Sequence, residues 1–138
     1  MKKAKILHQL ISKTLLDNIN KKQAEKDKTY HKYPSYKSLG ISAPKLSKIL
    51  KRFNKNIVQL NCKESLRLAE LLAERKVEEF VLSGNYVLKN HIDYLITSTD
   101  FMDHYANCFT NWSPVDDFCI NVLQAVLQKE QKSNTESG

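Results

Sequence analysis

A chain of 138 residues has the length of one ordinary domain. Hydrophobic residues make up 41% and charged residues 27%, which excludes a wholly disordered chain. The scarcity of helix breakers, three glycines and three prolines, favours helices. The net charge of +7 is uneven, because residues 1–55 carry 15 basic and three acidic side chains whereas residues 56–138 carry seven and 12. The amino-terminal part is therefore a candidate surface for a polyanion.

The compartment and the metal chemistry follow from what the sequence lacks. No stretch approaches the roughly 18 consecutive apolar residues that a membrane span needs, and no signal peptide is visible, so we expect a soluble protein. Cys62, Cys108 and Cys119 form no C-x-x-C pair, which favours buried thiols in a reducing cytoplasm. The four histidines show no ligand spacing, so no metal site is expected.

The first half of the chain contains two amphipathic patterns. Apolar residues recur at helical spacing from Ala4 to about Ala24, which predicts a first helix. Residues 25–40 are interpreted as a connection with at most one helical turn. Ser42 followed by Pro44 is typical of a helix start, and the helix that follows buries one apolar face while its lysines point elsewhere.

Shorter helices are predicted in the second half. A capping box, Asn61 with Glu64, begins a helix that continues toward Phe80. A break is predicted at residues 83–85, followed by helices over about 86–96, 100–109 and from 113 onward. No strand pattern is found, so the sequence predicts an all-α domain over residues 1–127, built of antiparallel helix pairs, and a polar, frayed tail over 128–138.

The segment Asn111-Trp112-Ser113-Pro114-Val115-Asp116 holds the single tryptophan of the chain, four residues before a carboxylate. A structural interpretation explains most of it, because Ser113 and Asp116 have capping-box spacing and Pro114 suits a first helical turn. That interpretation leaves Trp112 unexplained.

Two segments together resemble the DNA alkylation repair family, the AlkD-like DNA glycosylases built from HEAT-like repeats. The first is Leu39-Gly40-Ile41 with Pro44 and the basic helix behind it, and the second is the Trp112 to Asp116 pair. The likeness runs from about Tyr36 to Leu127, about the first half of a usual family member. It implies a HEAT-like α-solenoid of stacked antiparallel helix pairs.

The resemblance also implies a reaction, the excision of cationic N3- or N7-alkylated purines from double-stranded DNA without a cofactor. Asp116 would stabilise positive charge developing on the deoxyribose, and Trp112 would exclude solvent beside it. Backbone phosphates would be bound by four basic side chains of one helix: Lys45, Lys48, Lys51 and Arg52.

Enzymatic activity of this chain and its oligomeric state are left open by the sequence. One alternative is a non-catalytic helical module that binds nucleic acid through its charge, with steep salt dependence. Another is a HEAT-type scaffold that binds proteins through an apolar groove.

Overall fold

The computed structural model describes residues 2–31, 37–89, 99–109 and 112–119, together with 122, 124, 127 and 128. For residues 27–31, 99 and 112–114 the structure describes the backbone and not the side chains. All regular structure described is helical, and no strand occurs in it, as the sequence predicts. The helices are α1 (Lys2–Leu16), α2 (Lys21–His31), α3 (Ala43–Val58), α4 (Cys62–Ala73), α5 (Glu78–Leu88), α7 (Thr99–Ala106) and α8 (Trp112–Phe118).

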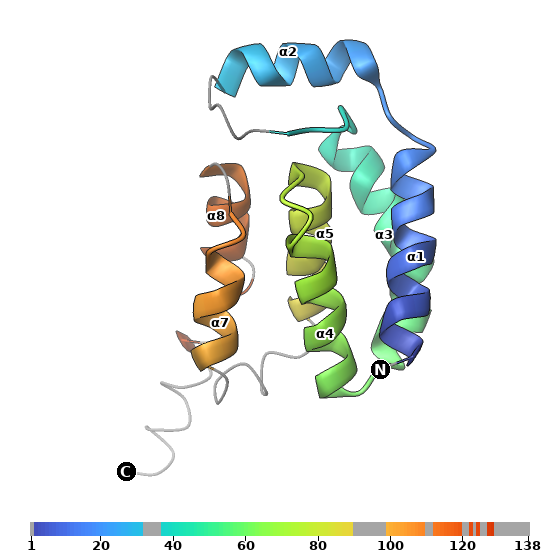
Figure 1. Cartoon of the computed structure of the whole chain (residues 1–138), viewed down its shortest axis with the longest axis vertical. Coiled ribbons are helices and arrows are strands. Elements are labelled where there is room, and N and C mark those ends of the chain that lie inside the picture. The colour runs from blue at the N-terminus through green and yellow to red at the C-terminus, as the bar shows by residue number, and fades with distance from the viewer. Residues whose placement is uncertain are drawn as a thin grey trace.

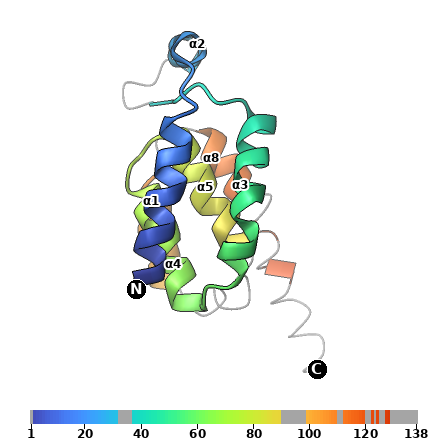
Figure 2. The ribbon, with the colours of Figure 1, turned by 90° about the vertical axis from the view of Figure 1, so that its right-hand side faces the viewer.

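Six of these helices form two facing layers of three. One layer consists of α1, α4 and α7, and the other of α3, α5 and α8, with α4 and α5 in the middle (Figure 1). Neighbours contact each other along each layer, and α1 packs on α3 and α4 on α5 across the layers. Figure 2 shows α1 and α3 side by side at the near end with α2 seen end-on above them, and Figure 1 shows α2 lying across the top of the molecule.

The core lies between the two layers. Ile11 and Leu15 of α1, Ile49 and Ile57 of α3 and Leu68 of α4 are almost completely buried. Around Tyr105 of α7, aromatic rings join the last pair of helices: Tyr105 and Phe118 have ring centroids 5.6 Å apart, and Phe109 and Phe118 also lie 5.6 Å apart. This core fixes how the α3–α5–α8 layer is presented to solvent.

The amino-terminal helix is shorter than predicted, and a second helix follows it. α1 ends at Leu16, where the side chain of Asn18 donates to the carbonyl of Thr14 at 2.7 Å. Asn20 then caps α2, because its side-chain oxygen accepts the backbone N–H of Gln23 at 3.1 Å. The prediction of one helix to Ala24 followed by a mostly non-helical connection is therefore wrong.

The break between α4 and α5 also differs from the prediction. It lies at residues 74–77, where Lys76 adopts a left-handed conformation with φ of 55°, and not at residues 83–85, which lie inside α5. Gly84 has a packing role there, because a Cβ atom would lie 2.6 Å from the Tyr105 hydroxyl and 3.1 Å from the Ala69 carbonyl oxygen. The small residue allows close helix contact instead of ending the helix.

A buried carboxylate fixes the loop before α3. Glu79 is 2% exposed, and it accepts the backbone N–H groups of Leu39 at 2.8 Å and Ile41 at 3.1 Å and the hydroxyl of Ser38 at 3.0 Å. Gly40 between them has φ of +73°, and a Cβ atom there would lie 2.2 Å from the carbonyl oxygen of Asn20. These contacts set the position at which α3 begins.

Candidate functional site on the α3–α5–α8 layer

Helix α3 is the main source of positive charge on its layer. Ser42 is the N-cap and accepts the backbone N–H of Lys45, and a proline occupies the first turn. Leu46, Ile49 and Leu50 are buried against the core, which leaves the basic side chains in solvent. Lys45, Lys48, Lys51, Arg52 and Lys55 are all exposed.

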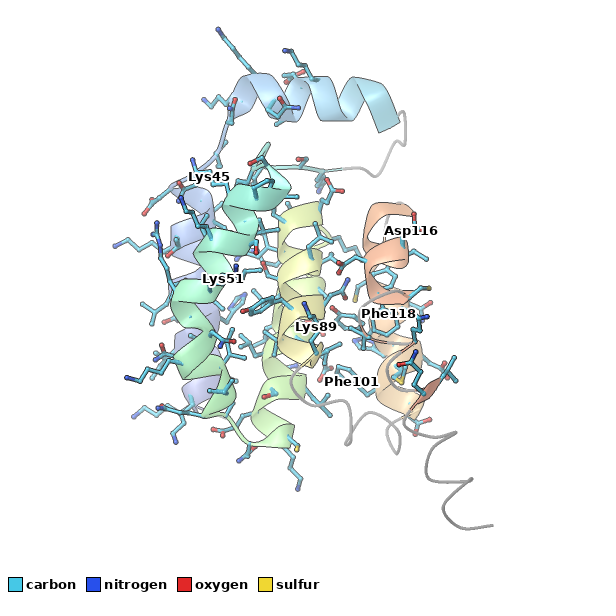
Figure 3. The ribbon with its side chains drawn as sticks, turned by 180° about the vertical axis from the view of Figure 1, so that it is seen from behind. Lys45, Lys51, Lys89, Phe101, Asp116 and Phe118 are labelled. Carbon is cyan, nitrogen blue, oxygen red and sulfur yellow. The ribbon has the colours of Figure 1, made fainter. Side chains whose placement is uncertain are left out.

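Three of the four predicted phosphate-binding residues line one open pocket. It has a volume of about 540 Å³ and is lined by Lys45, Lys48 and Arg52 together with Asn18 and Ser42. Lys51 does not line this pocket. Figure 3 shows it on α3, on the side nearer α5. The structure thus gathers three cations at one end of the layer, where an anionic group would meet several positive charges at once.

A second groove lies between α3, α5 and α8. Its volume is about 200 Å³, and it is lined by Leu46, Ser47 and Leu50 of α3, Leu82 and Tyr86 of α5, and Asp117 of α8, with Lys89 at the end of α5. The Lys89 ammonium lies 5.3 Å from the centroid of the Tyr86 ring, and the Tyr86 hydroxyl donates to Asn54 of α3 at 3.2 Å. We call this the α3–α5–α8 groove.

Asp117 is held by a chain of hydrogen bonds that begins in the core. The hydroxyl of Tyr105 donates to Asn85 Oδ1 at 2.6 Å, and Asn85 Nδ2 donates to Asp117 Oδ2 at 2.8 Å. The Tyr105 hydroxyl also lies 3.3 Å from the Val81 carbonyl oxygen, but its single proton favours the shorter contact. Burial, and next the charge of Asp117, raise the pKa of Tyr105 well above its usual value, so the hydroxyl remains a donor.

Asp116, the predicted catalytic carboxylate, is exposed on α8. Helix α8 belongs to the same layer as α3, and Figure 3 shows Asp116 on α8 with α5 between it and the helix that carries Lys45 and Lys51. Asp117, and not Asp116, is the carboxylate that lines the α3–α5–α8 groove. Trp112 begins α8, but its side chain lies outside the described residues, so its predicted place beside Asp116 stays a prediction.

Sequence reasoning missed the roles of Asn85 and Asp117. Asn85 had been assigned to a helix break, although it is completely buried inside α5. A signal was available for it, because an asparagine next to a glycine in an otherwise apolar helix needs a polar partner when buried. The local sequence does not indicate that Asp117, and not Asp116, meets α5, since the rotation of α8 decides this.

A potential metal-binding cluster lies on the other layer. His104 of α7 has Nε2 3.4 Å from Oε1 of Glu74, the C-cap residue of α4, and 3.9 Å from Oε2 of Glu70 within α4. Three such groups could hold a metal ion. A hydrogen bond between the His104 imidazole and Glu74 accounts for the contact without a metal ion, and this cluster does not belong to the α3–α5–α8 layer.

Three further observations concern the chain as a whole. The three cysteines are free thiols, but only Cys108 is buried, so the expectation of buried thiols is wrong for the partly buried Cys62 and the exposed Cys119. No described helix combines the length and apolar character of a membrane span. The side chain of His8 in α1 has a buried Nε2 without a hydrogen-bond partner, and burial, then Arg75 and Arg67, lower its pKa.

These observations define an all-helical protein in which a lysine-rich helix and a carboxylate-bearing helix share one layer. Comparison with models of protein families matches residues 11–137 to the family described as DNA alkylation repair enzyme. The chain belongs to that family, as its two sequence segments indicated, and the family implies a role in DNA repair. Searches of the curated proteins and of the solved structures find no match.

Proposed function

We propose that this protein is an alkylpurine DNA glycosylase that binds double-stranded DNA across the α3–α5–α8 layer and excises cationic N3- or N7-alkylated purines. The observation that carries the proposal is the placement of Asp116 on the same layer as the basic helix α3, in a chain of the DNA alkylation repair family. The paired helices α1 with α3 and α4 with α5 are compatible with a HEAT-like solenoid.

The chemistry requires little from the protein beyond charge and position. An alkylated purine already carries positive charge and departs as a neutral base, so positive charge develops on the deoxyribose in the transition state. The carboxylate of Asp116 would stabilise this charge and orient the attacking water, and the indole of Trp112 would shield the sugar from solvent. Atoms of the glycosidic bond and water account for the whole reaction, so no cofactor is needed.

Binding is proposed to rest on backbone phosphates. Lys45, Lys48 and Arg52 around the basic pocket, with Lys51 nearby on α3, would neutralise phosphates and release counterions. Such contacts position the duplex without reading its sequence.

The three free thiols suit the reducing cytoplasm that the sequence predicts.

The direct test is release of 7-methylguanine from methylated duplex DNA by the purified chain. Free base appearing above the spontaneous rate supports a glycosylase. Tight, salt-sensitive DNA binding without released base would instead favour the non-catalytic module that binds nucleic acid through its charge. Absence of DNA binding would leave a protein-binding scaffold as the alternative.

A further inference from the structure

The hydrogen-bonded chain of Tyr105, Asn85 and Asp117 connects the core to the α3–α5–α8 layer. It joins three helices, since Tyr105 lies on α7, Asn85 on α5 and Asp117 on α8. Tyr105 and Asn85 are completely buried. Each donor in this series of hydrogen bonds faces an acceptor, which fixes the orientation of the Asn85 amide.

The fold makes specific room for this chain. A Cβ atom at position 84 would lie 2.6 Å from the Tyr105 hydroxyl, so Gly84 permits the hydroxyl to reach Asn85. The ring of Tyr105 packs on Phe101, Phe109 and Phe118, with centroids 5.5 to 5.6 Å away. The side chain of Tyr105, where the series of hydrogen bonds begins, is thus held rigidly.

The contact at Asp117 has a geometrical consequence for its neighbour. Successive residues of an α-helix point about 100° apart, so an anchored Asp117 determines where the side chain of Asp116 projects. The described α8 spans the seven residues Trp112–Phe118, and a segment this short depends on tertiary contacts for its helical conformation. Its rotation is therefore set by side-chain contacts, of which Phe118 supplies an apolar and Asp117 a polar one.

We propose that Asn85 and Asp117 are positioning residues: held by Tyr105, they fix the rotation of α8 and so direct Asp116 toward its substrate. This inference rests on the proposed glycosylase function. A hydrogen bond from a buried amide is directional, whereas the ring contacts of Phe118 permit small rotations. A displacement of about 1 Å at a reacting group can lower a rate about 100-fold.

Two kinds of variant separate position from charge. Asn85→Leu is close to isosteric and removes the hydrogen bond to Asp117, and Tyr105→Phe removes only the hydroxyl that orients Asn85, which guards against a misfolded Asn85 variant. Asp117→Asn keeps an acceptor for Asn85 Nδ2 and removes the charge. We expect the two bond-breaking variants to release base about 10- to 100-fold more slowly at saturating enzyme, with DNA affinity unchanged. Asp117→Asn should remain within about threefold of the parent, because a neutral acceptor still holds the bond.

Several results overturn the proposal. If Asn85→Leu and Tyr105→Phe both release base at the parental rate below their melting temperatures, the hydrogen bonds between Tyr105, Asn85 and Asp117 have only a structural role. If Asp117→Asn loses as much rate as the bond-breaking variants, Asp117 acts through its charge and not through position.

A second readout does not depend on catalysis. Trp112 is the single tryptophan and the first residue of α8, so quenching of its fluorescence by acrylamide reports on this helix. A higher quenching constant in Asn85→Leu and Tyr105→Phe, but not in Asp117→Asn, supports the positioning role even if the parent protein releases no base. Identical quenching in all four proteins contradicts it, whatever their activity.

Discussion

The carboxylate of Glu79 accepts the backbone N–H of Leu39 at 2.8 Å, joining two residues that are 40 positions apart in the sequence. The same carboxylate binds Ile41, so the start of α5 fixes the loop that leads into the basic helix. A buried carboxylate that accepts three hydrogen bonds is stabilised by each of them. This contact links the packing of the core to the position of the lysines.

Glu79→Gln should therefore lower stability. The amide that replaces the carboxylate presents an NH₂ group to backbone N–H donors, and at least one donor loses its acceptor. We expect a loss of about 2 to 3 kcal/mol in the free energy of unfolding, measured by urea titration. Asp103→Asn on α7, an exposed carboxylate, is the matched control and should change stability by less than about 0.5 kcal/mol. Equal stability of the two variants would show that the Glu79 contacts contribute little.

His8 should make stability depend on pH. Its pKa in the folded protein is lowered by burial and by Arg75 and Arg67, so the unfolded chain binds the proton more readily. The contribution of His8 to the free energy of unfolding is therefore fully present above the ordinary histidine pKa of about 6.5 and is lost as the pH falls below it. Melting temperatures at pH 7.5 and 5.0 measure the effect, and His8→Gln should show a smaller decrease than the parent. A parent and variant with the same decrease would exclude His8 as the cause.

The cysteines should react in order of exposure. Cys119 is exposed, whereas Cys108 is buried and burial raises the pKa of its thiol. Because the thiolate is the reactive form, we expect iodoacetamide to label Cys119 at least about tenfold faster than Cys108 in the native protein. Mass spectrometry of timed digests measures both rates, with urea-unfolded protein as control. Equal native rates would contradict the buried environment of Cys108.

DNA affinity should depend on the basic pocket. Replacing Lys45, Lys48 and Arg52 by glutamine should lower the salt dependence of binding, with the slope of log K against log[salt] falling by about 2 to 3. The control replaces Lys5, Lys13 and Lys63, which are exposed on α1 and α4 of the other layer, and removes the same charge. Fluorescence anisotropy at several salt concentrations measures both slopes. Equal losses in the two triple variants would mean that only net charge matters.

The sequence predicted the parts of the fold that depend on local signals. The cap at Ser42 and the capping box of Asn61 with Glu64 were both found, because each is a pattern of neighbouring residues. Gly84 and Asn85 were misinterpreted, since their role depends on Tyr105, 20 residues beyond Asn85. The end of α1 was missed although Asn18 and Asn20 carried the signal. For the site, the family resemblance supplied Asp116, but only the packing of α8 shows that Asp117 meets α5.

The central claim is tested most directly by the rate of 7-methylguanine release from methylated duplex DNA under single-turnover conditions, comparing the parent with Asp116→Asn. Asp103→Asn serves as the control for an exposed carboxylate on another helix. Our account predicts release by the parent and by the control, and a rate lowered about 100- to 1000-fold in Asp116→Asn, with DNA affinity within about twofold. Release by Asp116→Asn at the parental rate would contradict it.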